Sequence, residues 1–86
     1  MFEILVHPHA LKHGLEEGEI LFAWENFIRK RHRDVPNNDQ MIAVGITQSD
    51  KYIQMVGVVK PYGLMIYHAM TPPTEKMLVE LGLGRR

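Results

Sequence analysis

Three histidines lie close together near the start of the chain, in the stretch HPHALKHG at residues 7–14. His9 and His13 are four residues apart, so on a helix they would share one face and could reach one metal ion. A zinc site needs further ligands, however, and Ala10 stands where the HExxH motif has its glutamate. Pro8 also leaves little regular helix beneath His9. We therefore interpret these histidines as surface and helix-end residues, and we predict neither a metal nor another cofactor.

The basic stretch RKRHR, which begins at Arg29, is a second candidate for chemistry. In a strand its three arginines would point to one side, and Lys30 and His32 to the other. A row of guanidinium groups suits phosphate oxygens, so the stretch is a candidate surface for RNA or another polyanion. The residues that would bind it are Arg29, Lys30, Arg31 and Arg33. Charges of this kind are equally typical of an edge strand, where they block unwanted strand pairing, and the sequence leaves both interpretations open.

The stretch IYHAM near the end of the chain contains a third candidate, His68. An unperturbed imidazole has a pKa of about 6.5, which suits proton transfer near neutral pH. Its neighbour Tyr67 could stack on a base or donate a hydrogen bond, although packing in the core is the ordinary role of a tyrosine. By alternation we expect His68 to share a strand face with Leu64 and Ile66. A histidine among apolar residues is more often a hydrogen-bonded core residue than a catalyst, so the structural interpretation stands beside the catalytic one.

The chain carries no net charge, but its charges are unevenly distributed. Carboxylates predominate in residues 1–26, and basic side chains predominate in residues 27–60. Such a separation can leave a basic surface on a neutral molecule, and a basic surface attracts polyanions. The same distribution along the sequence would arise if the fold brought the carboxylates next to the basic side chains, and in that case no basic surface would remain.

Several kinds of chemistry are excluded by residues and motifs that the sequence lacks. There is no cysteine, which excludes thiol nucleophiles, disulfides and cysteine zinc sites. There is no phosphate-binding glycine loop and no GxSxG serine motif. No apolar run approaches the roughly 20 residues of a membrane span, and the N-terminus lacks the basic and apolar regions of a signal peptide. We therefore expect a cytoplasmic protein that does not contact a membrane.

The candidate residues have to be positioned by one small domain. A chain of 86 residues can bury one modest core, so we predict a single domain over residues 1–86. The first part of the chain predicts a strand at 2–6, a short helix at 8–13 that Gly14 closes, and a longer helix at 16–26 with an apolar stripe at helical spacing.

From residue 27 onward the apolar period changes to two, which predicts strands. They are expected at 27–35, 41–47, 52–60 and 64–70. Short turns between consecutive strands favour an antiparallel meander. A closing helix follows, which Thr71 can cap and Gly82 or Gly84 can end. The predicted fold is α+β in the order β-α-α-β-β-β-β-α, a four-stranded antiparallel meander packed with two N-terminal helices and one C-terminal helix.

The stretch LKHGLEEGEILFAWEN at residues 11–26 resembles the N-terminal signature of BrnT-type toxins, in which Lys-His-Gly precedes a hydrophobic residue and a short acidic helix. The segment MIYHAMTPPTEKML at residues 65–78 falls where that family has its last strand and C-terminal helix. The resemblance implies a RelE-like fold, metal-independent RNA cleavage that arrests translation, and an antitoxin partner in a type II toxin–antitoxin system. The catalytic candidates that it implies are Arg29, Arg31, Lys51 and His68, with Tyr67 as the candidate proton donor.

The chain departs from the BrnT pattern in its last strand. Sequences of that family carry basic residues there and at the start of the final helix, whereas this chain has Ala69 and Met70. Either His68 and the arginines supply the missing charge, or the chain is a relative without ribonuclease activity. Two functions are therefore open, a ribonuclease toxin and a non-catalytic binding domain of the same fold. A third and weaker hypothesis is a metal-dependent enzyme that uses the N-terminal histidines.

The predicted meander leaves an exposed strand edge, and methionines recur in its apolar stretches. These methionines are Met55, Met65, Met70 and Met77. An exposed edge and an adaptable apolar surface both favour a covering partner. We therefore expect a homodimer or a complex with an antitoxin.

Overall fold

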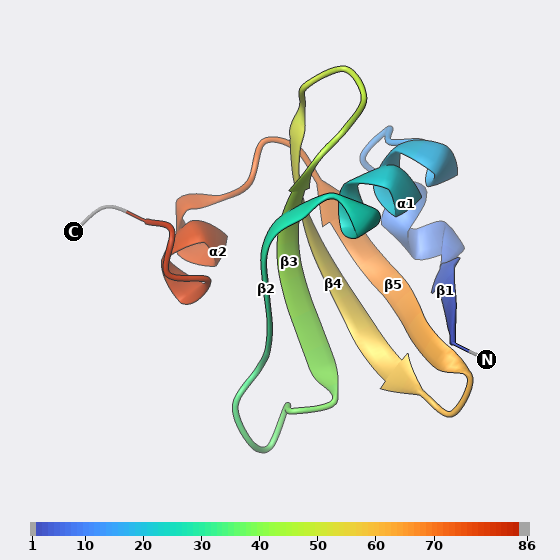
Figure 1. Ribbon diagram of the computed structural model, residues 1–86, viewed down its shortest axis with the longest axis vertical. Coiled ribbons are helices and arrows are strands. Elements are labelled where there is room, and N and C mark those ends of the chain that lie inside the picture. The colour runs from blue at the N-terminus through green and yellow to red at the C-terminus, as the bar shows by residue number, and fades with distance from the viewer. Residues whose placement is uncertain (1, 85–86) are drawn as a thin grey trace.

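The computed structural model describes residues 2–84 of the chain as a mixed α+β domain (Figure 1). In chain order its elements are β1 (Glu3–Val6), the 3-10 helix η1 (Pro8–Leu11), α1 (Glu17–Glu25), β2 (Phe27–His32), β3 (Gln40–Ile46), β4 (Tyr52–Lys60), β5 (Gly63–Met70) and α2 (Glu75–Glu80). The strands form one five-stranded sheet in the order β1-β5-β4-β3-β2. Strands β2 to β5 are an antiparallel meander, and β2 is one edge of the sheet.

The predicted four-stranded meander with three helices is wrong in two respects. First, β1 pairs in parallel with β5, with Glu3 opposite Gly63 and Val6 opposite Ile66, and so adds a fifth strand. Second, residues 8–11 form a single 3-10 turn, so the predicted order is also wrong at its second element. The backbone bonds there join residues three apart, from the Ala10 N–H to the His7 carbonyl and from the Lys12 N–H to the His9 carbonyl, which is the pattern of a 3-10 turn and not of an α-helix.

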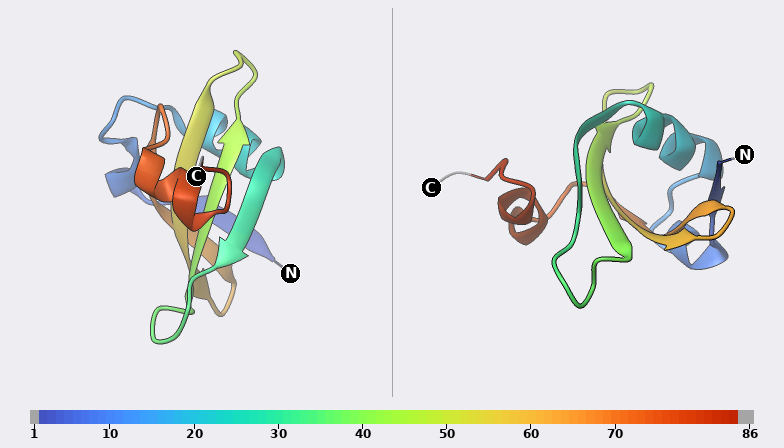
Figure 2. Two further views of the ribbon diagram at one scale, coloured as in Figure 1. Left: turned by 90° about the vertical axis from the view of Figure 1, so that its left-hand side faces the viewer. Right: turned by 60° about the horizontal axis from the view of Figure 1, so that its bottom comes forward.

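The two α-helices lie on opposite faces of the sheet, as Figures 1 and 2 show. Side chains of neighbouring residues in a strand point to opposite faces, so β3 contributes Ala43 to one layer and Ile42 to the other. The larger core, on the α1 side, consists of Ala10, Leu15, Ile20, Ala23, Trp24, Ala43, Ile53, Met55, Leu64, Ile66 and Ala69. The smaller core, on the α2 side, consists of Ile42, Val44, Met77 and Leu81.

Helix α1 packs closely on β3 because the strand has a glycine at the contact. A Cβ atom on Gly45 would overlap the carbonyl oxygen of Ala23 and lie 2.7 Å from its carbonyl carbon. At the start of the helix, the Glu19 carboxylate accepts a hydrogen bond of 3.0 Å from the Glu16 N–H. That contact satisfies one of the backbone donors that a helix leaves open at its N-terminus.

Residues 71–84, which we call the α2 arm, carry the second helix across the other face of the sheet. Thr74 caps the helix, since its hydroxyl accepts from the Met77 N–H at 3.2 Å. The prediction that Thr71 caps the helix is wrong, because its hydroxyl donates to the carbonyl of Tyr52 at 2.6 Å. Gly82, one of the two glycines predicted to end the helix, does so with a φ of 78°.

Candidate functional site

The arginines of the basic stretch lie on the face that carries α2, and they bind the end of that helix. Arg29 Nη1 donates to the carbonyl oxygen of Leu81 at 3.1 Å, and Arg31 Nη1 donates to the carbonyl oxygen of Glu80 at 3.1 Å. Carbonyls in the last turn of a helix lack intrahelical donors and carry partial negative charge. The two guanidinium groups therefore attach the C-terminal end of α2 to the edge of the sheet.

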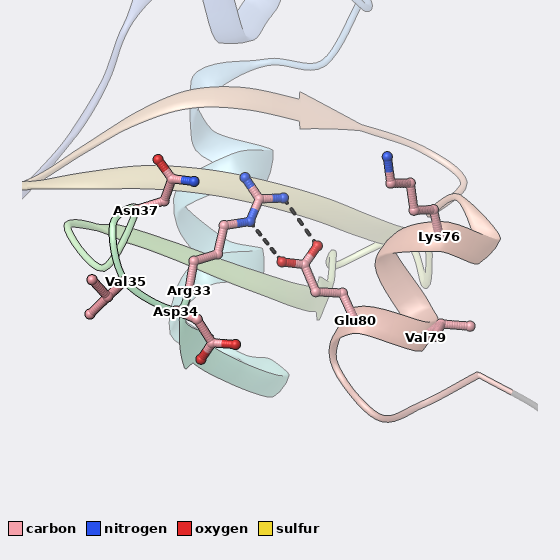
Figure 3. Close-up of a pocket in the computed structure, with 7 residues that line it drawn as sticks. All are labelled: Arg33, Asp34, Val35, Asn37, Lys76, Val79 and Glu80. Atoms are coloured by element: carbon pink, nitrogen blue, oxygen red, sulfur yellow. Dashed lines mark hydrogen bonds and ion pairs between the residues drawn. The ribbon is translucent and has the colours of Figure 1, made fainter.

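Arg33 makes the third contact with α2, through a side-chain carboxylate (Figure 3). Its Nε and Nη2 donate to Glu80 at 2.8 and 3.1 Å, and its Nη1 donates to Gln40 Oε1 at 2.7 Å. Hydrogen bonding to Arg33 lowers the pKa of Glu80, so the carboxylate stays charged well into the acid range. An open pocket of about 690 Å³ lies over this pair. A phosphate entering the pocket would have to displace Glu80 from Arg33.

His68 lies on the α2 side of the sheet, and the prediction that it shares a face with Leu64 and Ile66 is wrong. The pairing of β4 with β5 shifts register, so that Val56 lies opposite His68 but the next residue, Gly57, lies opposite Ile66. Tyr67 is the extra residue, and such a bulge reverses the facing of the residues beyond it. Leu64 and Ile66 therefore belong to the core on the α1 side, whereas His68 lines a cleft beside α2.

The imidazole of His68 ends a short hydrogen-bond chain that runs through Gln54 to Thr74. Gln54 Oε1 accepts from the Thr74 N–H at 2.7 Å and from the Thr74 hydroxyl at 3.1 Å, and Gln54 Nε2 lies 2.8 Å from His68 Nε2. A backbone N–H can only donate, which places the Gln54 oxygen toward Thr74 and its NH₂ group toward His68. His68 Nε2 must then accept this bond, so the ring is neutral with its proton on Nδ1.

The surroundings of His68 also favour the neutral ring. Burial lowers the pKa of His68 below its usual value of 6.5, and nearby positive groups lower it further. These groups are His13, Lys12, His9 and Arg33. The ring of His13 meets that of His68 edge-on, with 5.8 Å between the ring centroids. At neutral pH the lone pair of His68 is therefore already used, and it is not available to take a proton from a substrate unless Gln54 moves away.

The remaining predicted catalytic residues lie in other parts of the molecule. Lys51 Nζ pairs with Glu19 of α1 at 2.9 Å. The Tyr67 ring lies 4.6 Å from that of His7, between centroids. Arg31 contacts the end of α2 and pairs with Asp34 at 3.1 Å. The structure thus brings His68 close to Arg33, in one cleft of about 230 Å³, but it does not bring together His68, Arg31, Lys51 and Tyr67.

Lys30, the fourth residue predicted to bind RNA, faces the α1 side. Its Nζ lies 4.7 Å from the centroid of the Trp24 ring and 4.1 Å from that of Phe27. Contacts of this kind attract an ammonium to the aromatic faces. Burial lowers the pKa of Lys30. The Lys30 ammonium thus lies against the aromatic rings beside α1, so part of the basic stretch has a packing role.

An apolar groove that the sequence did not reveal lies between the α2 arm and the sheet. It has a volume of about 420 Å³ and is lined by Ile28, Val44, Tyr52, Pro72, Pro73, Leu78 and Leu83. At one end it meets the edge strand β2, where Phe27 and Ile28 are 48% and 47% exposed. Within residues 2–84 no strand pairs with the outer side of β2.

No family model, no curated protein and no solved structure matches the chain. The resemblance to BrnT-type toxins therefore stays a prediction. In the part of the chain that the structure describes, no helix is long and apolar enough to cross a membrane. Across residues 2–84, no three side chains of the metal-binding types lie close enough to hold one metal ion.

Proposed function

We propose that the chain is a non-catalytic binding domain that takes up an extended segment of a partner protein. The observation that carries this proposal is the continuity of the open edge of β2 with the apolar groove. Ile28 belongs to both, since it lies in the edge strand and lines the groove. An extended segment can add to a sheet edge through main-chain hydrogen bonds and seat a side chain in an adjacent pocket.

The charges of β2 indicate the chemistry of that partner. Arg29 binds an uncharged carbonyl and Lys30 lies over aromatic rings, so neither charge is neutralised by these contacts, whereas Arg31 already pairs with Asp34 at 3.1 Å. Acidic side chains on the incoming segment would lie beside Arg29 and Lys30. Two copies of β2 paired antiparallel would instead place basic residues opposite basic residues, which is unfavourable. The partner is therefore an acidic and apolar segment of a different protein, such as an antitoxin of the kind that the resemblance implies.

Selection from a library of random octapeptides is the test of this proposal. We expect it to enrich peptides in which Asp or Glu alternates with apolar residues, and we expect backbone amides of β2 to shift in NMR spectra when such a peptide binds. Ile28→Asp should weaken binding at least about tenfold, because it puts a charge at the mouth of the apolar groove.

Val59→Asp is the matched control for this substitution. Val59 is 42% exposed, close to the value for Ile28, but it lies in β4 and does not line the groove. The variant should bind the selected peptide as the unchanged chain does. Equal weakening by both variants, or enrichment of basic peptides, would contradict the proposed site.

A ribonuclease toxin is the second candidate function, and the pairing of His13 with His68 is the observation that favours it. Two imidazoles beside a lysine such as Lys12 can cleave RNA without a metal. One ring takes the proton of the ribose 2′-OH, which attacks phosphorus, and the other protonates the leaving 5′ oxygen as a cyclic phosphate forms. For His68 to take the first proton, Gln54 would have to release its Nε2 lone pair.

Incubation of the purified chain with RNA in the presence of a chelator separates the two candidates. A binding domain is expected to leave the RNA intact near pH 7, because the lone pair of His68 is occupied and the other candidates are dispersed. A metal-independent ribonuclease serves as positive control. Cleavage that disappears in both His13→Gln and His68→Gln, with the fold retained, would establish the ribonuclease instead.

A further inference from the structure

We propose that protonation of His68 releases the first turn of α2 from the sheet and thereby weakens the apolar groove. The effect on partner binding rests on the proposed function, whereas the release of the helix does not. The inference stands on the orientation of the hydrogen-bond chain from His68 through Gln54 to Thr74, which ends at the N-cap of α2.

The chain of hydrogen bonds accommodates only one protonation state of the ring. A proton on His68 Nε2 would point an N–H at the NH₂ group of Gln54, so that two donors face each other. Turning the Gln54 amide by half a rotation would relieve this contact, but it would then point NH₂ at the N–H of Thr74. Gln54 is 5% exposed, so water has little access to replace the lost partner. Either response breaks the link between the sheet and Thr74.

The same arm forms one wall of the groove. Pro72, Pro73, Leu78 and Leu83 line it from the arm, and Ile28, Val44 and Tyr52 line it from the sheet. Loss of the Thr74 contact loosens the arm near the prolines, while the contacts of the arginines hold its far end. Because a helix of six residues is not stable by itself, the first turn is expected to open when its attachment is lost.

The charged groups around His68 set the direction of the effect. His9, Lys12 and His13 face it from the N-terminal segment, Arg33 from the residue after β2, and Lys76 and Glu80 from α2. All are basic except Glu80, which is bound to Arg33. Positive neighbours and burial both oppose a charged ring, so the release occurs on the acid side of neutrality. Hydrogen bonding to Arg33 also lowers the pKa of Glu80, which favours the charged carboxylate and its contact with Arg33 on the acid side.

The stability of the arm should follow the titration of His68. A group whose pKa is lower in the folded than in the unfolded state stabilises the fold above its unfolded pKa, and this contribution is lost as the pH falls through the folded pKa. The first-turn amides are those of Met77 and Leu78, which donate to the hydroxyl and the carbonyl of Thr74, and their exchange can be measured one pH unit above and one below the midpoint of the His68 ring resonance. We expect their protection to fall about tenfold across this interval, with β3 and β4 unchanged.

His68→Gln and His13→Gln form a matched pair of variants. A glutamine at position 68 offers an acceptor to Gln54 but does not titrate, so protection of the arm should stay high at both pH values. A glutamine at position 13 removes a neighbouring titratable ring that makes no hydrogen bond to Gln54, so the pH dependence should persist. Nitrogen-15 spectra of the unchanged chain give a test without any variant, since Nε2 of His68 should be unprotonated at neutral pH.

Three results would overturn the inference. They are a protonated Nε2 at neutral pH, unchanged protection of the arm after His68 has titrated, and a full pH dependence in His68→Gln. None of these measurements uses a partner. They therefore test the release of the helix even if the peptide selection fails. When a selected peptide is used, its affinity should fall across the same pH interval in the unchanged chain but not in His68→Gln.

Discussion

Gly45→Ala is expected to cost the domain about 3 kcal/mol of its free energy of unfolding, the upper part of the usual range for overpacking. The added methyl group would overlap the carbonyl oxygen of Ala23 in α1. A side chain could rotate out of the way, but a helix backbone cannot, so α1 as a whole has to move off β3. Because α1 covers the larger core, that movement exposes apolar surface in the centre of the domain.

Gly18→Ala is the control for this substitution, and urea denaturation measures both variants. Gly18 lies in α1, and a Cβ atom there would meet nothing within 4 Å. Alanine is favoured over glycine in a helix by up to about 1 kcal/mol, so this variant should be slightly more stable than the unchanged chain. If both substitutions changed the midpoint of unfolding in the same direction, the result would contradict the close packing of α1 against β3 at Gly45.

Met77→Ala is expected to detach the α2 arm while the sheet stays folded. Truncation of a buried methionine costs about 2–5 kcal/mol in a well-packed core. Met77 is 5% exposed and belongs to the smaller core, whose other members, Ile42, Val44 and Leu81, are few enough that its loss removes much of the attachment. Amide exchange should show loss of protection in residues 77–83 and retained protection in β3 and β4.

Val79→Ala provides the comparison within the same helix. Val79 is 56% exposed, so its truncation should change stability by less than about 0.5 kcal/mol and leave the arm protected. If Met77→Ala instead unfolded the sheet together with the arm, the two cores on opposite faces would form one cooperative unit. If both variants behaved alike, burial of Met77 would not be the source of the attachment.

Local patterns in the sequence predicted the individual strands well, but they did not predict how the first strand would pair. Period two predicts a strand at 52–60, and β4 occupies those residues. The parallel pairing of β1 with β5 joins segments about 60 residues apart, and alternation along the chain carries no information about such a contact. The register shift at Tyr67 is equally invisible to a regular alternation, and it alone moved His68 to the other face of the sheet.

In the candidate site too, features that depend on neighbouring residues were predictable, whereas contacts between distant parts of the chain were not. Alternation correctly predicted that Arg29, Arg31 and Arg33 share one face, because this depends only on their own strand. Their partners in α2 lie about 50 residues further along the chain, so the structure was needed to show what these arginines bind. Gln54 did leave a signal, since it is a polar residue between Ile53 and Met55 in an apolar strand. A buried amide in that position requires partners, and His68 and Thr74 supply them.

The way in which Arg29 and Arg31 hold α2 has a consequence for how the chain tolerates sequence drift. Both donate to main-chain carbonyls, which every amino acid provides in the same place. The exposed positions of the helix can therefore accept many residues without loss of these two contacts, provided that the chain still turns at Gly82. The guanidinium groups have no such substitutes, because a lysine offers a point charge in place of a planar fork. Among descendants of this chain, substitutions should therefore accumulate at the exposed positions of α2, whereas Arg29 and Arg31 of β2 should stay unchanged.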